Sequence, residues 1–398
     1  MKNKSLSWKI LKVPPSPTLS ITAKAKALKR EGRDVLPLSA GEPDFPTPKQ
    51  VKDAALKAIE ENFTYYTPAS GTPELKEAIA EWTERKTGVK FSSKNVVVSP
   101  GAKFSIYASL AAILNPGEKV LIISPYWVSY PAMVQILGGE PHTVKTSPEN
   151  SFMPDLEELK TLIKDPRTKA IILNSPSNPA GVVYPKEFLK ELFEECVKNE
   201  VFIISDEIYG EIVYQDYSYP SSLADEIDGL KEFLIVINGV SKTFSMTGWR
   251  IGWLIANEEV VKLASVLQSQ STSNPTSISQ KAAEAALKDV PEEEIKRRVA
   301  EFMRRRDYLA EELSSINGLK PIVPSGAFYM FVNVEEAMKS KGFQKDTDFA
   351  EYLLEKLLIA TVPGSAFGAD GFLRISFATS MENLQKGVER LKKDLGEK

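Results

Sequence analysis

One stretch of the sequence places an amine, a hydroxyl and a guanidinium close together in a loop. Ser241, Lys242 and Arg250 lie within GVSKTFSMTGWRIGW (239–253), which follows the apolar run 233–238. A lysine amine can condense with a carbonyl group, and a serine hydroxyl and an arginine can bind a phosphate. The spacing differs from that of a P-loop, in which glycine immediately precedes the lysine. The stretch therefore indicates a site for a phosphorylated carbonyl compound.

Four further apolar runs are each followed by residues that can bind a ligand. In chain order these residues are Gly101, Ala102, Lys103, Trp127, Asn178, Asp206 and Tyr209. Ligands of open parallel sheets bind beyond the carboxyl ends of the strands, so we expect these residues to meet at one sheet edge. Each residue alone has an ordinary structural explanation, such as a helix cap, a turn or a core aromatic. Their joint placement favours a binding site.

The ligand that suits these residues carries a planar ring as well as a phosphate. The backbone N–H groups of residues 101–103, at the start of a helix, complete the phosphate site. Trp127 offers a stacking face, and the carboxylate of Asp206 can keep a ring nitrogen protonated. Tyr209 and Asn178 can each donate a hydrogen bond to a ring oxygen. Pyridoxal 5'-phosphate has all of these features and is the predicted cofactor.

The elements that must position these residues alternate along the first 290 residues. Short runs rich in β-branched residues are separated by stretches with apolar residues at helical spacing. This pattern predicts an α/β fold with a mostly parallel sheet and crossover helices. No run is followed by the G-x-G-x-x-G spacing of a dinucleotide-binding fold.

The pattern changes at Pro291. Apolar residues from Ile295 to Ile316 predict one long amphipathic helix that leads into a second domain. Two strand-like runs, 327–334 and 372–378, flank another helical stretch and predict a smaller α+β unit. We expect a large cofactor-binding domain over residues 48–290 and a small domain formed by residues 1–47 and 291–398.

Composition excludes several other classes of function. The net charge is −3, which gives no basic surface of the kind that nucleic acids require. The single cysteine, Cys196, and the single histidine, His142, exclude an intrachain disulfide, a cysteine or histidine metal cluster and a Ser-His-Asp triad, so no metal is expected. The N-terminal residues contain no continuous apolar stretch, so we expect no signal peptide, no membrane span and a cytoplasmic location.

Ordered motifs give the chain a resemblance to a known family. They include AGEPDFPTP, SPYWVSYP, NSPSNPAG, SDEIYGEIVY, SKTFSMTGWRIGW, VPGSAFG and LRISFATS. From about Pro14 onward the sequence resembles the class I and II aminotransferases, which are fold type I pyridoxal-phosphate enzymes, and most of all the subgroup Ib aspartate aminotransferases. The resemblance implies a large domain with a mostly parallel seven-stranded sheet between helices, a smaller α+β domain, and a homodimer with shared active sites.

The resemblance also assigns roles at the cofactor. Lys242 matches the Schiff-base lysine that also shuttles the proton, and Asp206 matches the partner of the ring nitrogen. Tyr209 and Asn178 match the donors to the phenolic oxygen of the ring, and Trp127 matches the stacked aromatic. The phosphate contacts match Gly101, Ala102, Lys103, Ser241, Arg250 and, from the neighbouring subunit, Tyr66.

Substrate contacts follow from the same resemblance. Arg374 matches the arginine that grips the α-carboxylate, beside the Gly41 backbone and with Trp127 and Asn178 nearby. The segment 269–277 lacks the arginine that another aspartate branch uses for the distal carboxylate. Lys103, aided by Ser16 or Thr18, is expected to bind that carboxylate instead.

Two positions depart from the pattern of the family. Ala180 replaces a threonine, which removes a hydroxyl beside Asn178. The histidine that often supports the ring-binding aspartate has no counterpart, because His142 is expected on a surface strand in a structural role.

We therefore expect an aminotransferase that moves the amino group of L-aspartate to 2-oxoglutarate in a ping-pong reaction. Its expected partners are small molecules, namely amino acid and 2-oxo acid substrates. The motifs around the cofactor do not contact the substrate side chain and therefore do not determine which amino acid is used. Prephenate, aromatic, alanine and kynurenine-type substrates remain alternatives. A pyridoxal-phosphate C–S lyase, which shares the fold and the cofactor, also stays open.

Overall fold

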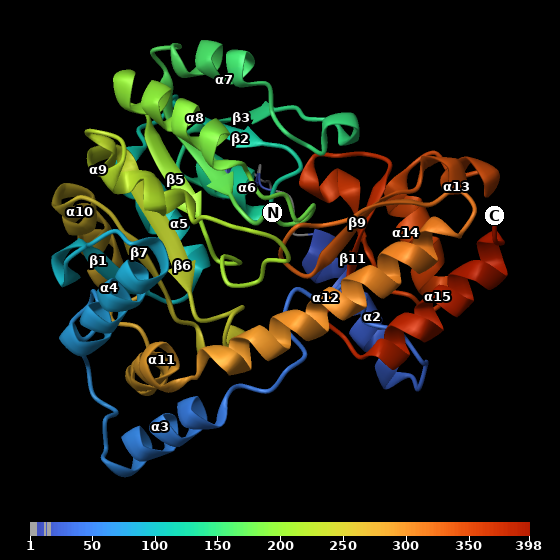
Figure 1. The fold of residues 1–398 in the computed structure, drawn as a ribbon, viewed down its shortest axis with the longest axis horizontal. Coiled ribbons are helices and arrows are strands. Elements are labelled where there is room, and N and C mark those ends of the chain that lie inside the picture. Colours follow the sequence, from blue (N-terminus) through green and yellow to red (C-terminus); the bar gives the residue numbers. More distant parts are fainter. Residues whose placement is uncertain (1–5, 12, 14–16) are drawn as a thin grey trace.

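The computed structural model describes residues 6–11, 13 and 17–398. Two α/β units lie side by side, and one long helix runs from one to the other (Figure 1). The larger unit is built on a sheet that, in the described part of the chain, has seven strands in the order β1-β7-β6-β5-β4-β2-β3. The strands are β1 (Val96–Ser99), β2 (Lys119–Ile123), β3 (Glu140–Val144), β4 (Thr168–Asn174), β5 (Phe202–Asp206), β6 (Leu234–Gly239) and β7 (Gly252–Ile255).

The strands β2 to β6 pair in parallel, whereas β7 is antiparallel to both of its neighbours. The predicted mostly parallel sheet is therefore confirmed. Strand β3 lies at the edge and carries His142, and its residues are mostly half-exposed. The alternation of charged, proline and histidine residues in β3 explains why it lacks the apolar run that marks the other strands.

Helices cover both faces of the larger sheet. Alternate residues of each strand enter opposite cores, so Val96 and Val98 pack on one face and Val97 packs on the other. The first face is covered by α4 (Pro73–Thr87), α7 (Leu156–Ile163), α8 (Lys186–Lys198) and α11 (Ser277–Asp289). The second face is covered by α5 (Ala102–Ile113), α6 (Ser129–Ile136) and α10 (Glu258–Ser269). Helix α3 (Lys49–Glu60) packs on α11, and the short α9 (Leu230–Phe233) precedes β6.

The smaller unit is built on an antiparallel sheet with the order β10-β11-β9-β8 within the described residues. Its elements are β8 (Lys320–Ile322), β9 (Tyr329–Asn333), α13 (Glu335–Ser340), α14 (Asp346–Lys356), β10 (Val362–Pro363), β11 (Phe372–Ser376) and α15 (Met381–Leu395). Helix α2 (Pro17–Arg30) packs beside β10, and Leu36 joins the core of this unit. The N-terminal segment from α2 onward thus contacts the smaller unit, while the exact domain bounds stay a prediction.

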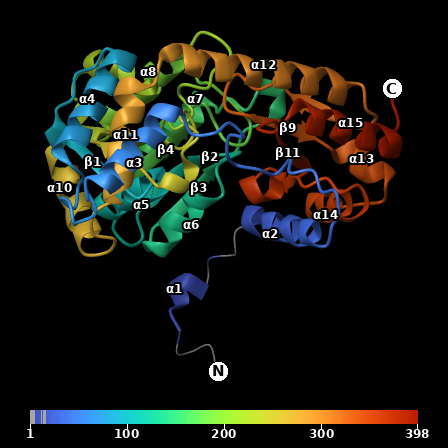
Figure 2. The ribbon, with the colours of Figure 1, turned by 90° about the horizontal axis from the view of Figure 1, so that it is seen from below.

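The long helix α12 (Glu292–Ser314) connects the two units. Ile295, near its start, packs in the core of the larger unit, and Phe302 and Leu309 pack in the core of the smaller one. At the other end of the chain, α1 (Trp8–Leu11) lies on the outside of the molecule, where it contacts α6 of the larger unit (Figure 2). None of the described helices is both long and apolar enough to cross a bilayer.

Candidate active site

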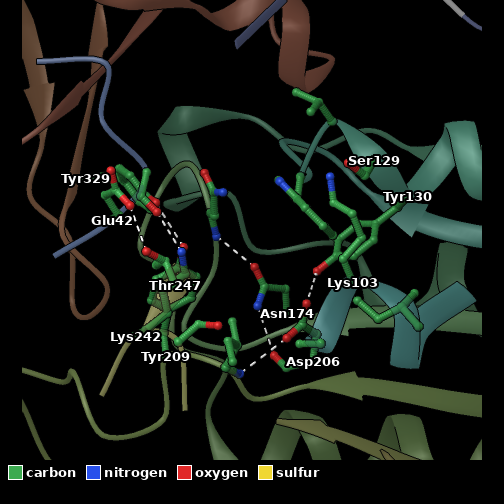
Figure 3. A pocket seen from close by; sticks show the side chains of 18 of the residues that line it. Glu42, Lys103, Ser129, Tyr130, Asn174, Asp206, Tyr209, Lys242, Thr247 and Tyr329 are labelled. Carbon is green, nitrogen blue, oxygen red and sulfur yellow. Dashed lines mark hydrogen bonds between the residues drawn. The ribbon is translucent and has the colours of Figure 1, made fainter. Parts of the chain in front are cut away.

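A cavity of about 460 Å³ lies at the carboxyl ends of the central parallel strands, where the two units meet. Its walls include eleven of the residues that the sequence predicted for the site. They are Gly41, Ala102, Lys103, Trp127, Asn178, Asp206, Tyr209, Ser241, Lys242, Arg250 and Arg374. Figure 3 shows how the side chains from the two units point toward one another across this space. The structure thus brings together residues that lie more than 300 positions apart in the sequence.

The start of helix α5 and Arg250 form an anion site at one end of the cavity. Gly101 caps the helix with φ +87°, and a Cβ atom there would overlap the Arg250 guanidinium. A Cβ atom at Gly252 would likewise overlap the backbone of Ala102. These two glycines therefore permit the close approach of a guanidinium to the free N–H groups of the helix. Arg250 is held there by hydrogen bonds from its guanidinium to the carbonyl oxygens of Thr247 (2.9 Å) and Pro100 (3.2 Å).

Asp206, at the end of β5, supplies a buried carboxylate at the base of the cavity. Tyr130 Oη donates a hydrogen bond to its Oδ2 (2.6 Å), and the backbone N–H of Ile208 donates to its Oδ1 (3.2 Å). Burial raises the pKa of Asp206 to about 6, although both hydrogen bonds and the charge of Lys242 act in the opposite direction. Asn174 fixes the local backbone by donating to the carbonyl oxygen of Asp206 (2.9 Å).

Trp127 and Lys103 form the wall next to this carboxylate. The Trp127 ring meets the Tyr130 ring edge-on, with 5.4 Å between the ring centroids. Lys103 Nζ lies 4.8 Å from the centroid of the Trp127 ring. Burial, and secondarily the positive charge of Arg250, lower the pKa of Lys103. Lys103 remains exposed on the cavity wall and therefore offers an accessible positive charge to a ligand.

Lys242 lies across the cavity from the tryptophan. Its Nζ donates a hydrogen bond to the carbonyl oxygen of Gly41 (2.6 Å) and lies 5.9 Å from the centroid of the Tyr209 ring. Burial lowers the pKa of Lys242 to about 8; the negative charge of Glu42 opposes this shift, and the charge of Arg374 adds to it. An amine with this pKa is a far better nucleophile and base near neutral pH than an ordinary lysine.

Arg374, on β11, adds a positive charge from the smaller unit to those of Lys103, Lys242 and Arg250. Its two terminal nitrogens donate to Asn178 Oδ1 (3.0 Å) and to the carbonyl oxygen of Ser39 (2.9 Å). Its Nε is buried and has no hydrogen-bond partner among the described residues. Tyr329 lies under the guanidinium, with 4.3 Å between the guanidinium carbon and the ring centroid. The arginine is thus rigidly placed and keeps donor capacity for a carboxylate.

Several predicted residues lie elsewhere. Tyr66, in the loop after α3, is 92% exposed and does not reach the cavity. Ser16 lies outside the described residues, and the side chain of Thr18 also falls outside the described part of the chain. Ala180 is fully buried beside the site. In the described ranges no group of three or more His, Cys, Asp or Glu residues is arranged to hold a metal ion.

Comparison with known proteins identifies the family. The family model for aminotransferase class I and II matches residues 33–391, which is most of the chain. The chain belongs to this family. The fold class and the enzyme class predicted from the sequence are therefore confirmed. The substrates of such an enzyme are small molecules, namely amino acids and 2-oxo acids.

Individual relatives of this aminotransferase match over their whole length. The probable aspartate/prephenate aminotransferase of Aquifex aeolicus is 45% identical, and the alignment covers 99% of this chain and 99% of the relative. The aspartate aminotransferase of Bacillus subtilis is 44% identical over 98% of both chains. The aspartate aminotransferase of Thermus thermophilus, solved with maleate, has a TM-score of 0.91 at 41% identity, covering 98% of this chain and 99% of that one.

The aminotransferase has site residues that the sequence prediction missed. Tyr130 fills the place beside Asp206 for which no histidine was found, and it stands only three positions after Trp127. Tyr329, Glu42, Thr247 and Asn174 also line the cavity. The motifs AGEPDFPTP, SPYWVSYP and SKTFSMTGWRIGW contained Glu42, Tyr130 and Thr247, but the contacts of these residues depend on side chains that meet only in the folded chain.

The pKa of Lys242 can be measured by its reactivity. In protein prepared without cofactor, an amine-acylating reagent should modify Lys242 with a pH midpoint near 8, instead of the ordinary 10.5. The neutral amine is the reactive form, so labelling is complete above this midpoint and is lost as the pH falls through it. Pulse labelling across a pH series, read by mass spectrometry, gives the midpoint.

Two variants serve as a matched pair for this measurement. Glu42→Gln removes the negative charge that raises the pKa of Lys242, so the midpoint should fall further. Thr247→Val removes only the hydroxyl that donates to Glu42 Oε2 (2.7 Å) and should change the midpoint less. A midpoint close to 10.5 in the unaltered protein would show that the amine is not desolvated.

Proposed function

We propose that this aminotransferase uses pyridoxal 5'-phosphate to move the amino group of L-aspartate to 2-oxoglutarate. The observation that carries the proposal is the enclosure of the Lys242 amine in one cavity with the Asp206 carboxylate, an anion site and the Arg374 guanidinium. These four features correspond to the aldehyde, ring nitrogen, phosphate and substrate carboxylate of the reaction.

The residues of the cavity fit the cofactor. Ser241, Arg250 and the first N–H groups of α5 would hold the phosphate in the space that Gly101 leaves free. Trp127 would stack on the ring, and Asp206 would pair with the ring nitrogen. When bound, pyridoxal 5'-phosphate supplies an electron sink for the electrons of the broken Cα–H bond.

Lys242 has two parts in this proposal. It would anchor the cofactor covalently through its amine, which a pKa near 8 makes nucleophilic. Once an amino acid has displaced it, the free Lys242 amine would accept the proton from the substrate Cα and would deliver it to the carbon that comes from the aldehyde group of the cofactor. Before the cofactor binds, the hydrogen bond to Gly41 O holds the amine inside the cavity.

Arg374 would bind the α-carboxylate of the amino acid, and Lys103 would bind a distal carboxylate. The names of the Aquifex aeolicus and Bacillus subtilis relatives support an acidic substrate, since these are a probable aspartate/prephenate aminotransferase and an aspartate aminotransferase. Lys103 supports it independently, because it places a positive charge on the cavity wall beside Trp127. Prephenate is the second candidate, since four of the similar relatives are named for both substrates and prephenate also carries a second carboxylate.

The proposed enzyme is a homodimer with shared active sites. Tyr65 and Tyr66 are 80% and 92% exposed, and other large apolar side chains on α3 and α10 are about half-exposed: Leu56, Ile59, Leu263 and Val266. Exposed apolar residues of this size in neighbouring elements are typical of an interface. A second copy of the chain would cover them and could bring its own Tyr66 to the phosphate of the first copy.

The reaction itself is tested with purified protein and added pyridoxal 5'-phosphate. L-Aspartate and 2-oxoglutarate should give oxaloacetate and L-glutamate, measured by a coupled assay for each product. Lys242→Ala should lower kcat by roughly 10²–10⁴-fold or more, because the general acid–base is lost. Formation of pyruvate from cystathionine without any 2-oxo acid would indicate a C–S lyase instead.

Selectivity for acidic substrates should depend on Lys103. In Lys103→Met, kcat/KM for L-aspartate should fall by about 10- to 100-fold, since one charge-assisted hydrogen bond contributes about 1.5–3 kcal/mol. The value for L-alanine, which has no distal carboxylate, should stay within about threefold and is the internal control. Parallel losses for both substrates would mean that Lys103 acts on the cofactor and not on the substrate side chain.

Mixed dimers test the shared site. In the proposed dimer each active site takes Lys242 from one chain and Tyr66 from the other. A hybrid of one Lys242→Ala chain and one Tyr66→Ala chain therefore has one site with both substitutions and one site with neither. Unfolding and refolding an equal mixture should restore roughly one quarter of the wild-type activity, although each parent is weakly active. A mixture no more active than the mean of its parents would place Tyr66 outside the partner's site.

A further inference from the structure

Tyr329 makes contacts at two functional points of the cavity at once. It is the first residue of β9, is almost completely buried, and belongs to the smaller unit. Its hydroxyl oxygen lies 2.9 Å from the hydroxyl oxygen of Tyr209, in the loop after β5 of the larger unit. Its ring face lies under the Arg374 guanidinium at 4.3 Å. Figure 3 shows Tyr329 and Tyr209 on the same side of the cavity as Lys242.

We propose that Tyr329 is a positioning residue that directs the Tyr209 proton toward the ring of the cofactor and holds the plane of Arg374 for the substrate carboxylate. This inference rests on the proposed function, because it assigns a partner to the ring oxygen and to the α-carboxylate.

The direction of the hydrogen bond follows from the number of protons. Each phenol has one proton, and either hydroxyl of the pair can donate to the other. If Tyr209 donates to Tyr329, the Tyr329 proton has no acceptor among the described residues and Tyr209 has none left for a ligand. If Tyr329 donates to Tyr209, the Tyr209 proton points to a ligand oxygen and both protons are used. A bound ring oxygen therefore selects the second arrangement.

Accepting this hydrogen bond makes Tyr209 a stronger donor. Hydrogen bonds in a chain polarise one another, and the effect is larger in a buried site. Burial also raises the pKa of Tyr329, against the influence of the Arg374 charge, so it stays a protonated donor at neutral pH. The charged groups around the pair are Arg374 on β11, Asp206 on β5, Glu42 and Lys242.

The aromatic ring of Tyr329 has a separate effect on Arg374. The terminal nitrogens of Arg374 are fixed by Asn178 and Ser39, and the Tyr329 ring supports the face of the guanidinium. The hydroxyl therefore acts on the cofactor, and the ring acts on substrate binding. These two contributions can be separated by substitution.

The test uses Tyr329→Phe, which removes the hydroxyl and keeps the ring, and Tyr329→Leu, which removes both. The readout is the pH titration of the absorbance of the bound cofactor, without substrate. A hydrogen bond to the ionised ring oxygen stabilises the deprotonated form, so losing it should raise the titration midpoint. We expect a rise of roughly half a pH unit in Tyr329→Phe, a larger rise in Tyr209→Phe, and no further rise in the double variant.

Steady-state kinetics distinguish the two contributions. KM for L-aspartate should stay within about twofold in Tyr329→Phe but rise in Tyr329→Leu, because only the latter loses the support of Arg374. An unchanged midpoint in Tyr329→Phe, or shifts that add in the double variant, would overturn the inference and leave Tyr329 as a packing residue. A wild-type protein that binds no titrating cofactor would overturn the proposed function and the inference with it. Thermal melting of each variant confirms that it is folded.

Discussion

The active site depends on keeping a half-buried amine, that of Lys242, and a buried carboxylate, that of Asp206, in one cavity without letting them pair. Opposite charges in a poorly hydrated space attract strongly, and a direct ion pair would remove both groups from chemistry. Lys242 instead donates to the carbonyl oxygen of Gly41, and Asp206 accepts from Tyr130 and Ile208. Each group is therefore satisfied by a neutral partner, and the space between them is left for a planar ligand.

The position of Gly41, and hence of Lys242, depends on a segment far from either in sequence. Phe45 lies between the guanidinium groups of Arg298 and Arg305 on α12, at 5.6 Å and 5.3 Å from the two guanidinium carbons. Arg298 also donates to Ser245 Oγ (3.0 Å), in the loop that carries Lys242. The helix that connects the two units thus contacts both the N-terminal segment beside Gly41 and the loop that carries Lys242.

The sequence predicted those parts of the site that local patterns encode. The continuous apolar run 170–174 could only be a buried strand, so Asn178 and the other residues after such runs had to meet at one edge. Tyr130 and Tyr329 could not be found in this way, because their roles depend on which buried partner their hydroxyls reach. Strand β3 was recognised only as a surface strand around His142, since an edge strand needs no continuous apolar run. Tyr66 cannot be placed in any site by a single chain, because it points away from the body.

The charges of the cavity explain why the cofactor is easier to infer than the substrate. Among the described residues, the cavity wall carries four basic side chains, Lys103, Lys242, Arg250 and Arg374, and two acidic ones, Glu42 and Asp206. The phosphate of the cofactor carries close to two negative charges and would balance the two excess positive charges of the cavity wall. With the cofactor bound, the net charge of the cavity would therefore no longer attract an anion. A distal carboxylate would therefore have to be recognised locally, and Lys103, beside the ring of Trp127, is the group that we propose for this role. Its long, rotatable stem can meet carboxylates at different distances, so this proposed role of Lys103 is compatible with a short diacid as well as with a larger ring-bearing one.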